Sequence, residues 1–195
     1  MKIIIANLKK NRITKEYVNE LSKIKTDNKV IVLPCNDDLN KYSFKNVFVG
    51  TQNIIDEDYS YVLLGHKDVR GKETDRMINN KIKKCIEKGI KIILCVDSID
   101  TLKKDLIDIN NYSDIIIAYE EDKFIGTSQI LTKSKIREFV RKAKKVTLSK
   151  SQIIYGGGIN EENLSIIKEI KELDGILVGN QSKSVSNLIS IINKY

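Results

Sequence analysis

The chain has 195 residues, of which 41% are hydrophobic and 31% are charged, and its formal net charge is +8. This composition suits a single globular domain, which we expect to span residues 1–195, and it is too apolar and too regularly patterned for a disordered chain. The longest apolar runs have only four to five residues, which excludes a bilayer-spanning helix, so no membrane partner is expected.

Two kinds of segment alternate along the chain. Eight short runs rich in β-branched residues read as strands buried on both faces: Lys2–Ala6, Val30–Leu33, Val47–Val49, Tyr61–Leu64, Lys91–Val96, Ile115–Tyr119, Gln152–Tyr155 and Gly175–Val178. Between most of them lie polar segments whose apolar residues have helical spacing: Lys15–Ile24, Arg76–Glu87, Leu102–Ile107, Ser134–Lys145, Glu161–Glu169 and Val185–Ile192. Eight strands alternating with helices predict an α/β fold, a compact (β/α)8 barrel; a doubly wound open sheet is the alternative.

One connection is too short for this pattern. Only residues 54–60 lie between Asn53 and the run that starts at Tyr61, whereas a parallel crossover normally takes a dozen residues or more. The third helix of the barrel is therefore expected to be a single turn or absent.

Polar residues gather where the predicted strands end. In a (β/α)8 barrel these ends meet at one opening, where the reacting groups lie. The ends carry an amide and a lysine (Asn7, Lys9), the only histidine of the chain (His66), a carboxylate (Glu120), and a series of glycines. A carboxylate and an imidazole can move protons, a lysine can stabilise negative charge, and glycine backbone can approach a phosphate. Taken singly, each feature is common as a solvated rim residue or a turn, so the coincidence on five strand ends carries the argument.

In this order, the strand-end segments resemble the triosephosphate isomerase family over nearly the whole chain. The matching segments are ANLKKN, VGTQNI, YVLLGHKDVR, IKIILCV, IIIAYEEDKFIGTS, IIYGGGINEENL and DGILVGN. The resemblance implies a TIM barrel that interconverts dihydroxyacetone phosphate and D-glyceraldehyde 3-phosphate with neither cofactor nor metal.

The resemblance also implies a role for each strand-end residue. Glu120 is expected to remove a proton beside the carbonyl, while His66, as a neutral imidazole, polarises the carbonyl. Lys9 offsets the charge of the enediolate, and Asn7 hydrogen-bonds the substrate oxygens. Residues 121–127 form a lid, and backbone N–H groups hold the phosphate at Gly126, Gly158, Gly179 and Asn180. Asp68 stands where the family has a glutamate that pairs with the lysine.

Several residues depart from the family pattern. Glu121 stands in place of a proline in the lid, Gly158 in place of a serine that helps to hold the closed lid, and Asn180 in place of a glycine. The shortened third connection cannot form the long loop that props up a neighbouring subunit's site in the family. We therefore expect no dimer of the family type, but a monomer or another kind of oligomer.

Two further readings remain open at this stage. These departures would also suit an inactive or weakly active barrel that binds phosphorylated metabolites or a protein partner. The net charge alone would suit a nucleic-acid binder, but its lysines are spread along the chain rather than concentrated, so no nucleic-acid partner is expected. Three cysteines without CxxC spacing and an N-terminus without a signal-peptide pattern predict a reduced, cytoplasmic protein.

Overall fold

In the computed structural model, which describes all residues 1–195, eight parallel strands close into a barrel in the order β1 to β8. The strands are β1 (Ile3–Asn7), β2 (Lys29–Leu33), β3 (Phe48–Gln52), β4 (Tyr61–Leu64), β5 (Lys91–Val96), β6 (Ile115–Tyr119), β7 (Gln152–Gly156) and β8 (Gly175–Val178). Closure is direct, because β1 pairs with β8 from Ile3 opposite Gly175 to Ala6 opposite Val178. The predicted barrel is confirmed, and the open sheet is excluded.

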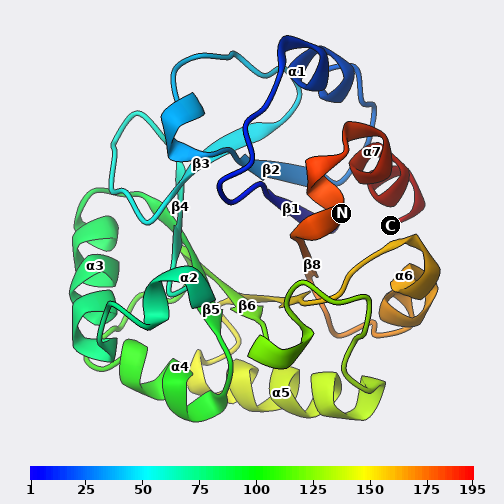
Figure 1. Ribbon diagram of the computed structural model, residues 1–195. Coiled ribbons are helices and arrows are strands. Elements are labelled where there is room, and N and C mark those ends of the chain that lie inside the picture. The colour runs from blue at the N-terminus through cyan, green and yellow to red at the C-terminus, as the bar shows by residue number, and fades with distance from the viewer.

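Seven α-helices and three 3-10 turns join the strands (Figure 1). The helices are α1 (Lys15–Leu21), α2 (Lys67–Arg70), α3 (Asp75–Glu87), α4 (Ile99–Asp105), α5 (Lys133–Val146), α6 (Glu161–Lys168) and α7 (Val185–Lys194), and the 3-10 turns are η1 (Asn36–Asp38), η2 (Asp122–Phe124) and η3 (Asn180–Lys183). None of the helices has both the length and the apolar character needed to cross a membrane.

The helix expected over Leu102–Ile107 begins and ends earlier than the apolar spacing suggested. It starts at Ile99 because the Ser98 side chain accepts a hydrogen bond from the Thr101 N–H and caps the first turn. It ends at Asp105, and the chain soon turns through a left-handed residue, Asp108 (φ 59°).

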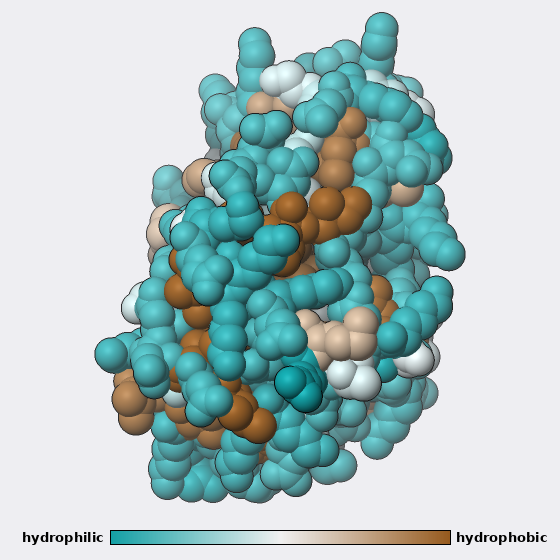
Figure 2. All heavy atoms as spheres, turned by 90° about the vertical axis from the view of Figure 1, so that its left-hand side faces the viewer, coloured by the Kyte–Doolittle hydropathy of each residue, from teal (hydrophilic) through white to brown (hydrophobic).

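Two connections, not one, lack an α-helix. The third connection, from β3 to β4, has none, as predicted, but the second, from β2 to β3, holds only the 3-10 turn η1. Where these two connections run, at the upper left of Figure 1, the barrel is bordered mainly by loops. The face around α3 and these loops is largely hydrophilic, with apolar atoms in separate patches (Figure 2). Partly buried side chains from the loops, among them Tyr42, Phe44 and Ile55, pack on the core in place of helices.

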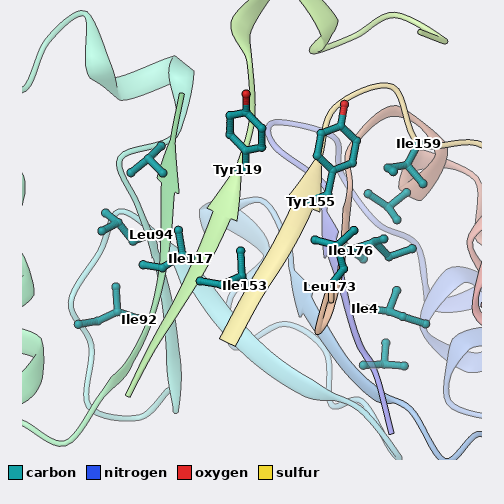
Figure 3. Close-up of a cluster of buried hydrophobic side chains, with 14 of the residues drawn as sticks. Ile4, Ile92, Leu94, Ile117, Tyr119, Ile153, Tyr155, Ile159, Leu173 and Ile176 are labelled. Atoms are coloured by element: carbon teal, nitrogen blue, oxygen red, sulfur yellow. The ribbon is translucent and has the colours of Figure 1, made fainter. Parts of the chain in front are cut away.

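The apolar core has two layers. Inside the barrel lie 12 buried residues from alternate strand positions, among them Ile5, Leu33 and Ile93. The other layer, of 42 buried residues, packs between the strands and the helices. Figure 3 shows part of it, with side chains on neighbouring strands and the rings of Tyr119 and Tyr155 at the ends of β6 and β7. This rigid scaffold fixes where each strand end presents its side chain.

Candidate active site

The first strand ends in a buried amide followed by a lysine. Asn7 is 1% exposed, and its Oδ1 accepts a hydrogen bond of 3.1 Å from the Lys9 N–H. Lys9 adopts a left-handed backbone conformation (φ 52°). The Asn7 Nδ2 group is buried and has no hydrogen-bond partner. A buried, unpaired donor at a cavity wall is available to a ligand oxygen.

Gln52, at the end of β3, holds the backbone of this segment. Its Nε2 donates to the carbonyl oxygens of Lys9 (3.0 Å), Leu33 (3.2 Å) and Pro34 (2.6 Å). Gln52 is in turn fixed by Asn36, which exchanges two hydrogen bonds with the Gln52 backbone, of 2.8 and 3.1 Å. Neither residue was predicted from sequence to have a role, although Gln52 lies within the VGTQNI segment that resembles the family.

His66 follows β4 and caps the short helix α2. Its ring is almost fully buried, and Nδ1 accepts a hydrogen bond of 3.3 Å from the Asp68 N–H. This hydrogen bond favours the tautomer whose proton is on Nε2. The Nε2 atom has no partner in the protein and is available to a ligand.

Arg70, which was not predicted as a site residue, holds the backbone of the turn before His66. Arg70 donates to the carbonyl oxygens of Gly65 (2.9 Å) and Cys95 (2.7 Å) and pairs with the buried Asp105. A side chain at Gly65 could not fit, because its Cβ would lie 2.6 Å from the Arg70 guanidinium and 2.8 Å from the Cys95 carbonyl oxygen. Burial opposes the charge of Arg70, but the hydrogen bond and charge of Asp105 outweigh it and raise the pKa of Arg70.

Glu120 follows β6 and points across the barrel mouth towards His66. It is 6% exposed, and its Oε2 lies 3.9 Å from His66 Nε2 without a hydrogen-bond partner. Gly156 makes room for it, since a Cβ there would lie 2.7 Å from Glu120 Cγ. Burial, and then the charge of the neighbouring Glu120, raise the pKa of the Cys95 thiol well above its ordinary value, so this thiol stays protonated.

One cavity is lined by almost all of the predicted site residues. Eight of the nine predicted residues line it: Asn7, Lys9, His66, Glu120, Gly126, Gly158, Gly179 and Asn180. Ile125 and Thr127, from the segment predicted to form a lid, also line it. The glycines among these residues leave backbone uncovered by side chains at the cavity wall, as anion sites require.

The ninth residue, Asp68, lies elsewhere. Lys9 forms no ion pair with it, whereas the Asp68 carboxylate lies 3.4 Å from His66 Nδ1 and is 54% exposed. The side chain is one methylene shorter than glutamate and sits in the first turn of α2, beside the histidine that caps this helix. The lysine–carboxylate pair that the resemblance implied is thus replaced by a contact with His66.

A larger hollow of about 960 Å³ adjoins the cavity and shares Lys9 and His66 with it. Asn53 and Ile54, from the short β3–β4 connection, line it. No group of three or more His, Cys, Asp or Glu side chains is arranged to hold a metal ion.

Comparisons with known proteins agree with this geometry. A family model described as triosephosphate isomerase matches residues 48–195. The chain belongs to the triosephosphate isomerase family. The triosephosphate isomerase of Dehalococcoides mccartyi is 31% identical over 175 residues, which cover 77% of this chain and 69% of that protein. That of Campylobacter jejuni subsp. doylei is 33% identical over 159 residues, covering 74% and 69% of the two chains.

A third relative spans the family fold from end to end. The triosephosphate isomerase of Campylobacter hominis is 26% identical over 231 aligned residues, which cover 98% of this chain and 99% of that protein. An alignment longer than 195 residues means that the relative carries insertions, so this member of the family has shorter connections. The family model begins at Phe48 and therefore leaves out β1 and β2. Asn7 and Lys9 are placed in the cavity by the structure itself.

Proposed function

We propose that this chain is a triosephosphate isomerase, which interconverts dihydroxyacetone phosphate and D-glyceraldehyde 3-phosphate by proton transfer through an enediolate. The observation that carries the proposal is the pair of buried, unpaired atoms Glu120 Oε2 and His66 Nε2, 3.9 Å apart at the wall of one cavity. Buried polar atoms without partners are rare. A substrate bound between an acceptor and a donor would satisfy both.

In this mechanism Glu120 is the base. A carboxylate at the cavity wall removes the proton from the carbon beside the carbonyl and returns it to the neighbouring carbon. The neutral His66 donates its Nε2 proton to the carbonyl oxygen as negative charge develops there. It regains a proton from the neighbouring hydroxyl oxygen, which becomes the new carbonyl oxygen. Because both groups are buried, their interaction with the developing charge is weakly screened by water. In this family a glutamate base acts beside a neutral histidine, and the surroundings of each group determine its acid or base role.

Lys9 and Asn7 stabilise the enediolate. The Lys9 ammonium forms no ion pair within the protein, so its charge is available to the oxygens of the intermediate. The Asn7 Nδ2 donor is buried and unpaired, and it is held at the cavity because Asn7 Oδ1 is already bonded to the Lys9 N–H. A donor fixed before the substrate arrives needs no reorganisation during the reaction.

The phosphate is held at the opposite end of the cavity, under the lid. Backbone N–H groups at Gly126, Gly158, Gly179 and Asn180 supply donors, and these residues come from the lid, the β7 end and the β8 end. Anchoring the phosphate away from the reacting carbons provides binding energy that orients them between Glu120 and His66.

The decisive experiment measures conversion of D-glyceraldehyde 3-phosphate to dihydroxyacetone phosphate by the purified protein and by Glu120→Gln. General acid–base catalysis of this kind contributes about 10²- to 10⁴-fold, and we expect a loss of this size in Glu120→Gln. The control is Glu169→Gln, which changes a 60% exposed carboxylate and should keep wild-type activity. A folded wild-type protein without activity would contradict the proposal and favour a barrel that binds phosphorylated metabolites without turning them over.

A further inference from the structure

One side chain from a distant segment is bonded to the second half of the lid. Asn180 Nδ2, just after β8, donates a hydrogen bond of 3.0 Å to the carbonyl oxygen of Gly126 in the lid, 54 residues away in the chain. Lys67 donates to the Asp122 carbonyl and Tyr119 to the Glu121 carboxylate, both in the first half of the lid. In the second half, Thr127 Oγ1 is bonded only within its own loop, to Phe124 and Gln129. Asn180 is thus the one distant side chain that ties the second half.

Gly158 stands where the family resemblance implies a serine that helps to hold the lid, and this position cannot carry a side chain. Gly158 has φ +66°, and a Cβ there would lie 1.8 Å from the Gln129 carbonyl oxygen. A serine hydroxyl, which the family resemblance implies at this place, would therefore require the chain after the lid to move. Asn163 pins that chain where it is, because its Nδ2 donates to the carbonyl oxygens of both Gly158 (2.7 Å) and Ser128 (3.2 Å).

The Asn180 carboxamide could donate a second hydrogen bond in addition to the one to Gly126. Its Nδ2 carries two hydrogens, and Gly126 is the only acceptor that the protein offers it. Asn180 also lines the cavity beside Gly126 and Gly179. A glycine at position 180 would have no side chain to reach the lid.

We propose that Asn180 is a positioning residue that latches the lid at Gly126 and so replaces the hydroxyl latch that Gly158 cannot supply. By holding Gly126 beside Asn180 at the cavity before substrate binds, the latch places the Gly126 N–H at the proposed phosphate subsite. This role rests on the proposed function only for its catalytic consequence; the latch itself is a property of the free protein.

The test is limited trypsin digestion of the ligand-free protein, followed by mass spectrometry of the cut between Lys123 and Phe124. The Lys123 side chain is 63% exposed and lies in the lid. When opening is fast, the rate of cleavage follows the population of the open form. Loss of one hydrogen bond changes such a population by about 3- to 10-fold. We expect cleavage at Lys123 to rise by this factor in Asn180→Ala and in Asn180→Asp, whose carboxylate cannot donate.

The matched control is Asn187→Ala, which removes another exposed carboxamide near η3, bonded to Gln181 and not to the lid. It should leave the cleavage rate at Lys123 unchanged, and cleavage at sites outside the lid should be unchanged in every variant. Cleavage of Asn180→Ala at the wild-type rate would overturn the latch.

Kinetics then separate the latch from the proposed function. In Asn180→Ala we expect the KM for D-glyceraldehyde 3-phosphate to rise about 3- to 10-fold, with a smaller change in kcat, because Glu120 and His66 stay in place. An unchanged KM would overturn the catalytic part of the inference. Lid cleavage could be faster in Asn180→Ala while neither the wild type nor any variant has isomerase activity. That result would support the latch and contradict the proposed function.

Discussion

His66 Nε2 and Glu120 Oε2 lie 3.9 Å apart at the wall of one cavity, and neither atom has a hydrogen-bond partner in the protein. The other ring nitrogen, Nδ1, accepts a hydrogen bond of 3.3 Å from the Asp68 N–H as the ring caps α2. This bond orients the imidazole so that Nε2 faces the cavity.

Replacing His66 by asparagine should lower kcat for D-glyceraldehyde 3-phosphate by about 10²- to 10⁴-fold. The shorter amide cannot place a donor where Nε2 lies. Steady-state kinetics measure the loss, and circular dichroism of the variant confirms that the barrel is intact. Activity at the wild-type level in a folded variant would show that His66 has no part in proton transfer.

Gln52 should matter for activity although we assign it no contact with the substrate. Gln52→Ala removes the donor that holds the carbonyl oxygens of Lys9, Leu33 and Pro34. Small misplacements of catalytic groups are costly, and we expect kcat to fall roughly 10-fold as Lys9 loses its fixed position. Gln152→Ala is the control, because Gln152 is exposed at the opposite end of a strand. Equal kcat values for the two variants would exclude a role for Gln52 in positioning Lys9.

The short β3–β4 connection predicts a protein that does not form a dimer through this region. The chain from Asn53 to Ser60 contains no helix, and its first two residues, Asn53 and Ile54, line the hollow next to Lys9 and His66. Sedimentation velocity should show a species with the mass of one chain.

The variant Ile54→Lys sharpens this test. Ile54 is 45% exposed within the connection, and a lysine there would disrupt any packing against a second copy. A wild-type dimer that Ile54→Lys dissociates would show that the connection is an interface after all.

Asp38 should make stability depend on pH below about 4. Its carboxylate is buried, accepts a hydrogen bond of 3.1 Å from the Ile13 N–H and pairs with Arg12 at 2.6 Å. Burial alone would raise its pKa, but the Ile13 N–H and the Arg12 guanidinium outweigh this effect and lower the pKa of Asp38. A lowered pKa means that the folded state gains stability above the unfolded pKa of about 3.9 and loses it as the pH falls through the folded value.

Asp38→Asn therefore should lower the free energy of unfolding by about 2 kcal/mol at pH 7, and the difference from wild type should shrink below pH 4. Urea unfolding at both pH values measures it. Asp37→Asn is the control, because Asp37 is 75% exposed and its contact with Arg12 is long, at 3.4 Å, so its loss should cost little at either pH. An equal deficit for Asp38→Asn at pH 7 and pH 3 would contradict the charge-based explanation.

The barrel and the polar residues at its strand ends could be predicted from sequence because both follow from patterns within short segments. Continuous apolar runs identify strands that are buried on both faces, and parallel strands in a closed barrel bring their carboxyl ends to one opening. That argument alone places Asn7, His66 and Glu120 together, although 113 positions separate the first from the last.

Other features were decided only by tertiary contacts. The second missing helix was not foreseen, since the absence of a pattern between Leu33 and Phe48 is a weak signal, and only the packing of Tyr42 and Phe44 on the core shows what covers the barrel there. The same holds for Arg70, Gln52 and Asn180, whose partners lie in distant segments.

The sequence by itself determined the fold class and the set of chemical groups, because hydrophobic periodicity and residue type are properties of short segments. The tertiary structure decided which nitrogen of His66 faces the cavity, that Asp68 contacts His66 and not Lys9, and that Asn180 reaches Gly126. Each of these depends on distances of about 3 Å between atoms that the chain path brings together, and hydrogen bonds lose most of their strength when such distances change by less than one ångström.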